Sequence, residues 1–306
     1  MIKYSAILFS VIIMLFYTIE ANAQRFKNKH KYNSVGGSVA LTHYFGDLNP
    51  AGDFYSLNIR TTGIGLAAHY IKKLNPRLSV RGQLQVGTIY GNDAKTSRKK
   101  DGIYRNRRNL SFKNTLYELK ADVIIDLMEN RRDLRKRSDW NYYAFVGLAG
   151  FYHNPKAKID GKWHALQPLG TEGQNIDGVG VDRRYSKFGL AIPFGVGVKY
   201  KYKTFWDISF EVGMRATFTD YLDDVSTNYV GRDKFSEDDI AYRLNDRALE
   251  AATDEETLVY ENGEVYVNGY GREGEQRGSP SNDWYWSSNI TLTYIIQPRF
   301  ESPKFR

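Results

Sequence analysis

Three aspartates, Asp220, Asp223 and Asp224, lie close together in the sequence TFTDYLDDVS at residues 217–226. Clustered carboxylates can act as general acid and base, or can bind a cation such as Ca²⁺. The five histidines of the chain are scattered, with no pair at a metal-ligand spacing. No nucleophile motif accompanies the aspartates either. Their role therefore depends on the element that carries them.

The segment that leads into the aspartates, residues 206–218, alternates between apolar and polar residues. This two-residue period is typical of a β-strand with one apolar face. Most of the alternating segments are longer than the roughly 9–11 residues that a tilted strand needs to cross a bilayer, whereas a soluble β-sandwich would use shorter strands. The chain has eight such segments, at about residues 35–45, 59–71, 78–90, 110–127, 141–151, 188–200, 206–218 and 286–296.

Long and short connections alternate between these segments. The long links are residues 46–58, 91–109, 152–187 and 219–284, and the short links are residues 72–77, 128–139 and 201–205. In outer-membrane barrels the long loops face outward and the short turns face the periplasm. The sequence therefore predicts an all-β fold, an eight-stranded antiparallel transmembrane β-barrel over residues 34–298. A periplasmic arm (24–33) and a periplasmic C-terminal tail (299–306) flank it.

The first 23 residues have the pattern of a secretory signal peptide, with Lys3, an apolar run at 7–19 and Ala-Asn-Ala at 21–23. An uncleaved anchor is the alternative, although the run is short for a spanning helix. The absence of cysteine excludes disulfides, thiol catalysis, Cys-ligated metals and a lipoprotein anchor. The net charge of +8 favours anionic lipid or an acidic protein partner over nucleic acid in an exported protein. We therefore expect the bacterial outer membrane as the location.

The polar faces of the predicted strands carry charged residues that a barrel would direct into its lumen. An eight-stranded lumen is narrow and is filled by side chains, and charges held away from water must pair with one another. A proton or ion path is the alternative, but the spacing of the charged residues does not indicate such a path. The predicted lumen charge network consists of Arg81, Glu118, Lys120, Asp122, Glu211 and Arg215.

Residues 188–200 carry glycine at 189, 195 and 197 on the face that should point inward. Glycine there predicts tight curvature or space for a bulky neighbour. Pro193 shares that face and cannot donate a ladder hydrogen bond, so we expect a β-bulge near it.

Basic residues cluster in two of the predicted connections. The periplasmic turn 129–137 could dock an acidic partner, or could lie against lipid headgroups. Its candidate docking residues are Arg131, Arg132, Arg135, Lys136 and Arg137. The outer loop 91–109 could bind lipopolysaccharide, or its charges could serve only to keep it soluble. Its basic residues are Arg98, Lys99, Lys100, Arg105, Arg107 and Arg108.

An ordered series of motifs resembles the PorG-like outer-membrane barrels associated with the type IX secretion system. The motifs are YFGDLNP (44–50), RNLSF (108–112) with LYEL (116–119), FYHNPKA (151–157), LQPLGTEGQ (166–174), IPFGVG (192–197), TFTDYLDDVS (217–226), and RG (277–278) followed by DWY (283–285). The resemblance covers nearly all of residues 35–296. The long acidic stretch at residues 231–276 departs from the family pattern.

The resemblance implies a non-enzymatic subunit of the type IX secretion and gliding machinery, without a cofactor. Such a subunit links the outer membrane, with its lipid and lipopolysaccharide, to a periplasmic ring of PorK- and PorN-like proteins. The residues Asp220, Tyr221, Asp223 and Asp224 then become rim residues at the base of the last outer loop, with Asp223 and Asp224 against Arg277. A calcium site at this rim stays open.

Two other classes of function remain. A stand-alone surface barrel would bind a ligand or adhere through its outer loops. An outer-membrane enzyme would place acidic residues and a histidine at the outer rim, and no histidine can be assigned to the aspartates.

Overall fold

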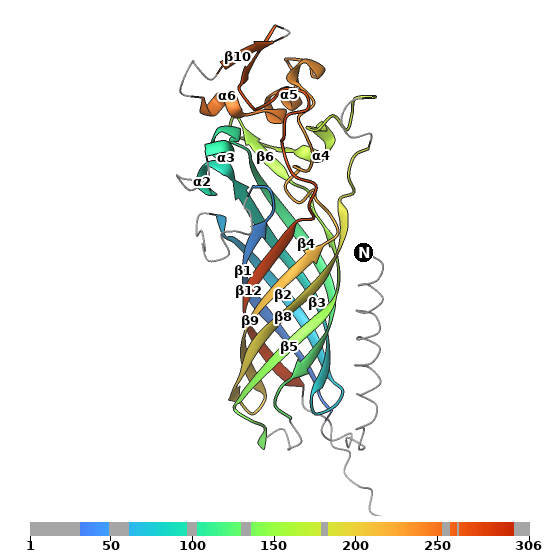
Figure 1. The fold of residues 1–306 in the computed structure, drawn as a ribbon. Helices are drawn as coiled ribbons and strands as arrows, with labels where there is room; N and C mark the ends of the chain where they lie inside the picture. The colour runs from blue at the N-terminus through green and yellow to red at the C-terminus, as the bar shows by residue number, and fades with distance from the viewer. Residues whose placement is uncertain are drawn as a thin grey trace, which may run out of the picture.

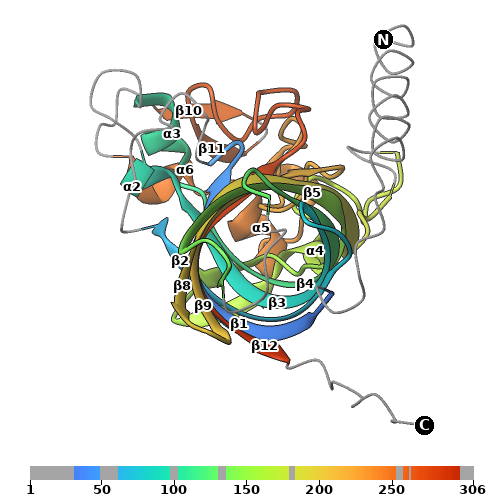
Figure 2. The ribbon, with the colours of Figure 1, turned by 90° about the horizontal axis from the view of Figure 1, so that it is seen from below.

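The computed structural model describes residues 31–48, 61–96, 103–129, 136–178, 183–252, 258–261 and 263–296. Eight long strands form one closed antiparallel barrel, because each pairs with its neighbours in chain order and β12 pairs with β1 (Figures 1 and 2). This confirms the predicted eight-stranded barrel. The strands are β1 (Asn33–Phe45), β2 (Gly63–Lys73), β3 (Leu78–Asn92), β4 (Ser111–Asp126), β5 (Trp140–Tyr152), β8 (Phe188–Lys203), β9 (Trp206–Thr217) and β12 (Trp284–Ile296).

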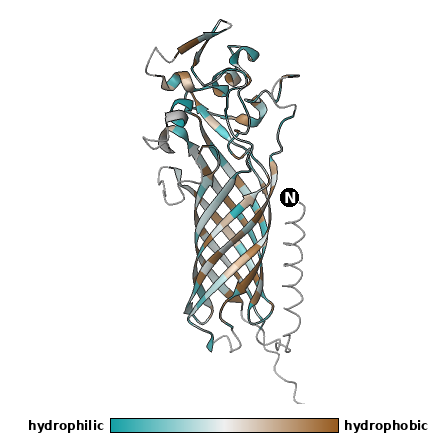
Figure 3. Cartoon of the chain, viewed as in Figure 1, coloured by the Kyte–Doolittle hydropathy of each residue, from teal (hydrophilic) through white to brown (hydrophobic). Residues whose placement is uncertain are grey.

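The outward faces of all eight strands are apolar, and hydrophobic residues recur along the barrel wall (Figure 3). Polar inward residues alternate with these positions, which is the pattern of a barrel that faces lipid. The exposed apolar residues include Val39, Leu66, Leu84, Leu119, Leu148, Leu190, Phe210 and Ile290, one from each strand.

Aromatic side chains mark the two ends of this apolar wall. Tyr117, Tyr152 and Phe188 form a continuous row, the outer girdle, with ring centroids 6.3 and 5.2 Å apart. At the other end Trp140 packs on Tyr200 and Trp206 on Tyr294. Aromatic rings gather at membrane–water interfaces, so these rows indicate where the bilayer begins and ends.

Short turns join the strands at one end of the barrel, at residues 74–77, 127–139 and 204–205. The long connections lie together at the other end, at the top of Figure 1. Their described residues fold into a layer that we call the outer cap. It contains α2 (Asp93–Thr96), α3 (Ile103–Arg108), β6 (Lys156–Ile159), β7 (Lys162–Ala165), α4 (Leu166–Leu169), η5 (Arg232–Lys234), α5 (Ile240–Asn245), α6 (Ala248–Ala251), β10 (Leu258–Glu261) and β11 (Glu264–Val267).

The outer cap has an apolar core of its own, which is continuous with the upper end of the barrel. Leu110, Leu166, Leu222 and Leu244 come from three different connections and are buried together. Within the acidic stretch, Asp239 caps α5 by accepting a hydrogen bond from the Ala241 amide at 3.0 Å. The long connections therefore form a folded layer. In the described part of the chain, none of the helices is both long enough and apolar enough to span a bilayer.

Glycines of β8 make room for aromatic side chains of β5 inside the barrel. Tyr143, Phe145 and Phe151 lie directly opposite glycines 197, 195 and 189. A Cβ at these three glycines would lie 2.3, 2.7 and 2.4 Å from the ring that faces it, too close for any side chain. Glycine on this face thus gives bulky neighbours their space.

The prediction of a β-bulge near Pro193 is wrong. The β5–β8 ladder skips Ile192 and Pro193 and resumes in the same register, with Val146 opposite Phe194 and Ala149 opposite Ala191. The missing N–H is thus accommodated by a local gap in one ladder, without an extra residue. The register shift lies instead near the periplasmic end, between Lys201 and Lys203.

Candidate functional site in the lumen and at the outer rim

A buried arginine joins opposite walls of the lumen. The guanidinium of Arg81 on β3 lies 2.6 Å from a carboxylate oxygen of Asp122 on β4 and 2.6 Å from one of Glu211 on β9. It also lies over the ring of Phe145, 4.9 Å from the centroid. Strands β3 and β9 are four apart in either direction around the barrel. The Arg81–Glu211 pair therefore crosses the full width of the lumen.

A second ion pair lies nearer the outer end. Arg215 on β9 is completely buried and lies 3.4 Å from Glu118 on β4. It also donates hydrogen bonds to Ser287 at 2.6 Å and to Gln85 at 3.2 Å. Tyr285 on β12 donates to Glu118 from the opposite wall. The outer half of the lumen is thus also filled by polar contacts between strands.

The six residues of the predicted lumen network all lie inside the barrel. Lys120 completes the set, with its ammonium 3.1 Å from Asp122 and 4.9 Å from the centroid of Phe145. Three cations and three carboxylates therefore share the same interior, and their charges cancel. Such an arrangement holds the strands together and offers no unpaired charge to a passing ion.

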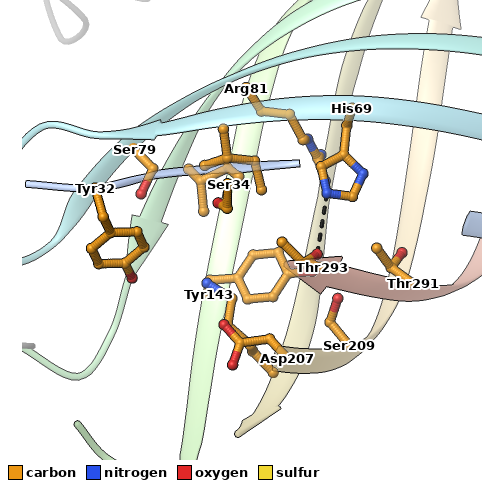
Figure 4. Close-up of a pocket in the computed structure, with 13 residues that line it drawn as sticks. Tyr32, Ser34, His69, Ser79, Arg81, Tyr143, Asp207, Ser209, Thr291 and Thr293 are labelled. Carbon is orange, nitrogen blue, oxygen red and sulfur yellow. Dashed lines mark hydrogen bonds between the residues drawn. The ribbon is translucent and has the colours of Figure 1, made fainter. Parts of the chain in front are cut away.

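A small polar cavity lies between the network and the periplasmic mouth (Figure 4). Its volume is about 20 Å³, and a water molecule needs about 10–15 Å³. Arg81 and Tyr143 line it, and His69 and Thr293 share a hydrogen bond of 3.1 Å across it. The cavity has room for water but none for a permeating solute.

The predicted docking turn is only partly described. Arg131, Arg132 and Arg135 lie outside the described residues. Lys136 is exposed, whereas Arg137 is buried in the periplasmic mouth. The Arg137 guanidinium lies 2.6 Å from Asp207 and also donates to two carbonyls of the β8–β9 turn. Arg137 therefore ties two turns together and does not present its charge to a partner. The signal for this pairing was Asp207, an acid on the inward face of β9.

Two aspartates share one hydroxyl group at the outer rim. Tyr44 Oη lies 2.6 Å from Asp223 and 2.7 Å from Asp283. A hydroxyl has a single proton to donate, so one of the two carboxyl groups has to be protonated and donate in return. Burial and the neighbouring carboxyl groups raise the pKa of both Asp223 and Asp283 well above the usual range. This pair closes the junction between β1, the last outer loop and β12.

Asp224 faces a different set of groups. It accepts hydrogen bonds from Thr171 and, at 2.6 Å, from Tyr185. Arg277 approaches it at 4.0 Å and lies 2.9 Å from Glu172. Burial raises the pKa of Asp224 to about 6, against the lowering effect of Arg277. Asp224 therefore links the long loop at residues 153–187 to the last outer loop.

Asp220 and Tyr221 complete the rim. Asp220 accepts hydrogen bonds from the Ser226 hydroxyl and from the Ser281 amide at 3.2 Å, and burial raises its pKa to about 7. Tyr221 stacks on Tyr185 with ring centroids 4.5 Å apart. None of the described residues forms a group of three or more histidines or acids able to hold a metal ion. The contacts of the rim residues are those of cross-links between loops.

Arg108, part of the predicted basic cluster of the outer loop, is also a cross-link. It is buried, lies 2.8 Å from Asp93, and donates to the carbonyls of Asp47 and Arg277. Its charge is therefore not offered to lipopolysaccharide or to solvent. Arg107 is exposed, and residues 98–100 lie outside the described residues.

The raised pKa values predict that the outer cap opens more readily as the pH rises. In the folded cap, Asp224 and one of Asp223 and Asp283 keep their protons. In an opened cap these carboxyl groups have their ordinary pKa near 3.9 and release the protons above that pH. Between pH 4 and 6, Asp224 alone should increase the opening equilibrium about tenfold per pH unit. Hydrogen exchange of the rim amides, corrected for the intrinsic rate, measures this. Asp224→Asn should remove this part of the pH dependence, and protection that increases with pH would contradict the prediction.

Solved outer-membrane proteins have similar folds. The attachment invasion locus protein Ail of Yersinia pestis aligns over 87% of this chain and 97% of its own, with 8% sequence identity and a TM-score of 0.34. Neisserial surface protein A aligns over 86% and 96%, with 9% identity and a TM-score of 0.37. A major outer membrane protein from Thermus thermophilus aligns over 86% and 99%, with 10% identity and a TM-score of 0.39. No protein-family model and no curated protein matches the sequence.

Proposed function

We propose that this chain is a non-conducting, non-enzymatic outer-membrane subunit of a type IX protein export machine. Its barrel would anchor a folded cap outside the membrane and would offer its short-turn end to partners in the periplasm. The observation that carries the non-conducting part is the Arg81–Glu211 ion pair, which crosses the lumen. Exported proteins would therefore pass beside this barrel and not through it.

The energetics of the lumen favour a closed state. Opening a path would require Arg81 to leave both Asp122 and Glu211 while these groups stay in a narrow, poorly hydrated interior. Leaving one buried charge without its partner costs about 3–5 kcal/mol. Among the described residues Glu211 has no other cation within ion-pair distance, and Asp122 would keep only Lys120. Thermal motion would therefore open the lumen only rarely.

The motif series supports the export assignment, and the cap gives it a physical meaning. Motifs that are far apart in the sequence meet at the rim. Tyr44 from the first contacts Asp223 and Asp283 from the last two, and Glu172 from the fourth contacts Arg277. Residues from four of the motifs thus belong to one structural unit, whereas IPFGVG (192–197) lies in β8 of the barrel wall. Ring proteins resembling PorK and PorN are the proposed periplasmic partners.

Two measurements test the proposal. In planar bilayers the purified barrel should give no conductance steps above the bare membrane, under conditions in which a sixteen-stranded porin does. After mild detergent extraction from its own cells, the barrel should co-purify with periplasmic ring proteins. A barrel recovered alone, from cells that secrete normally without it, would refute the export role. Regular conductance steps would refute the closed lumen.

A stand-alone surface barrel is the second candidate, and one observation favours it. The β10–β11 hairpin of the outer cap exposes Tyr260 to 76%. Exposed aromatic side chains at a loop tip suit a ligand or an adhesion partner. Deleting residues 258–267 should abolish cell adhesion without affecting secretion if this candidate holds. Under the export proposal the same deletion should leave adhesion unchanged.

A further inference from the structure

Strand β6 of the β6–β7 hairpin lies beside the upper end of β4, where it continues β5 in the same register (Figure 1). Lys113 of β4 lies directly opposite Lys156 of β6. Side chains directly opposite one another in an antiparallel pair share a face of the sheet. Two lysines are therefore held side by side where the barrel meets its cap.

The same face carries a third lysine and a tryptophan. Ala157 and Ile159 point into the apolar core of the cap, so the alternate residues Lys156 and Lys158 point outward and are exposed. Trp163 of β7 lies opposite Lys158, and 48% of its surface is exposed. We call Lys113, Lys156, Lys158 and Trp163 the lysine–tryptophan patch.

Aromatic rings fix the position of one of these charges. The Lys113 ammonium lies 5.6 Å from the ring centroid of Tyr90 and 5.6 Å from that of Trp163. Cation–π contacts of this kind hold an ammonium without neutralising it. The patch is thus partly preorganised and keeps its full positive charge.

The patch has no acid to balance it in the described part of the chain. No ion pair of Lys113, Lys156 or Lys158 occurs among these residues. The acid of this hairpin, Asp160, is bound by Arg243. Like charges directly opposite one another destabilise a sheet. An anion held between the lysines would remove this cost.

The depth of the patch relative to the membrane indicates which anion it meets. The outward face of β4 carries Tyr117, Thr115 and Lys113 in that order toward the outer cap. Tyr117 belongs to the outer girdle. A rise of about 3.3 Å per residue and a tilt of about 40° place Lys113 about 10 Å beyond Tyr117. This is the depth of lipid headgroups, and a lysine side chain can reach back toward the girdle.

We infer that the lysine–tryptophan patch binds the phosphate of a lipid headgroup in the outer leaflet. The three ammonium groups would supply the charge, and Trp163 would lie in the interface beside the lipid. A lipid is favoured over a soluble anion because the patch adjoins the girdle and the apolar wall below it. The inference rests on the proposed membrane location and is independent of the proposed export role.

Binding of diphosphoryl lipid A to the detergent-purified, full-length barrel tests the inference, with native mass spectrometry as the readout. The wild-type protein should retain the lipid, and added salt should weaken binding. The variant Lys113→Gln/Lys156→Gln/Lys158→Gln should bind at least about tenfold more weakly. The matched control, Lys72→Gln/Lys136→Gln/Lys203→Gln, removes the same charge at the other end and should bind like the wild type.

Two further arms separate the sources of phosphate. Dephosphorylated lipid A should bind weakly to the wild type, and millimolar inorganic phosphate should not displace the diphosphoryl lipid. Equal binding by the patch variant and the wild type, or displacement by inorganic phosphate, would overturn the inference. Heat-dependent gel migration shows that each variant is folded, and the salt titration of the wild type gives an answer without any variant. None of these outcomes depends on conductance or on secretion, so the export proposal is judged separately.

Discussion

Arg81→Met should lower the free energy of unfolding of the barrel by about 3–5 kcal/mol, the cost of leaving buried charges without their partner. The substitution keeps most of the side-chain volume and its packing on Phe145. It leaves Asp122 with only Lys120 at 3.1 Å, and it leaves Glu211 with a hydrogen bond from Tyr143 at 3.2 Å and no cation within ion-pair distance among the described residues. Equilibrium unfolding in urea, with the barrel in lipid vesicles and tryptophan fluorescence as the signal, measures the loss.

A second substitution separates the loss of charge balance from the loss of volume. Arg81→Met/Glu211→Gln removes the unpaired carboxylate as well, so it should recover part of the lost stability, and the coupling between the two positions should be at least about 1 kcal/mol. Lys72→Met is the control, because Lys72 is exposed on the neighbouring strand; it should change stability by less than about 0.5 kcal/mol. A loss below about 1 kcal/mol for Arg81→Met would mean that water replaces the arginine, and the closed lumen would then be untenable.

Arg81 also shows how far the sequence alone leads. Its inward direction follows from the alternation of residues 78–90, and a narrow lumen requires that it pair. The identity of its partners does not follow from the sequence pattern. Asp122 is its neighbour only because β3 and β4 pair in one particular register, with Arg81 opposite Asp122. Glu211 is its partner because the sheet closes into a barrel that brings β9 opposite β3. Alternation fixes the face of a residue, whereas register and closure fix its neighbours.

The errors at Arg108 and Arg137 have the same origin. Both lie in basic runs of predicted loops, where solvation is the usual state of an arginine. In the structure each is the buried partner of one acid, Asp93 for Arg108 and Asp207 for Arg137. The available signal was an acid at the end of a strand: Asp93 comes directly after β3, and Asp207 is the second residue of β9. The fold of the outer cap was less accessible still, because its core joins short segments from four connections that have no common period.

Arg277 was expected to lie against Asp223 and Asp224, and the structure agrees in part. Arg277 approaches Asp224 at 4.0 Å, whereas Asp223 is bound by Tyr44 and not by Arg277. Arg277 is fully buried, with Nη1 at 2.9 Å from Glu172 and at 2.7 Å from the Asp224 carbonyl, and Nε at 3.2 Å from the Asn245 carbonyl. Three parts of the outer cap thus meet on one side chain. Arg277→Met should lower the free energy of opening of the cap by about 3–5 kcal/mol, because it leaves Glu172 buried without its cation.

This loss should be confined to the cap if the strands hold the barrel without it. The amides of Ser226 and Thr227 donate hydrogen bonds to Glu172 at 2.9 and 3.2 Å. Hydrogen exchange of these two amides should accelerate by about 100-fold or more. The urea midpoint of the barrel should stay near that of the wild type. Arg277→Lys should recover part of the protection, because it restores the charge but not the second donor. Arg243→Met is the matched control, since its pair with Asp160 is exposed and worth at most about 1 kcal/mol.

Arg277→Met could instead lower both the free energy of opening of the cap and the urea midpoint of the barrel. That result would have a different meaning. The rim joins the cap to β1 and β12 through Tyr44 and Asp283, so an opened cap could expose the upper strand ends to water. Cap and barrel would then unfold as one cooperative unit. The rim aspartates would in that case stabilise the membrane strands as well as the loops, and the cap could not open without weakening the membrane anchor.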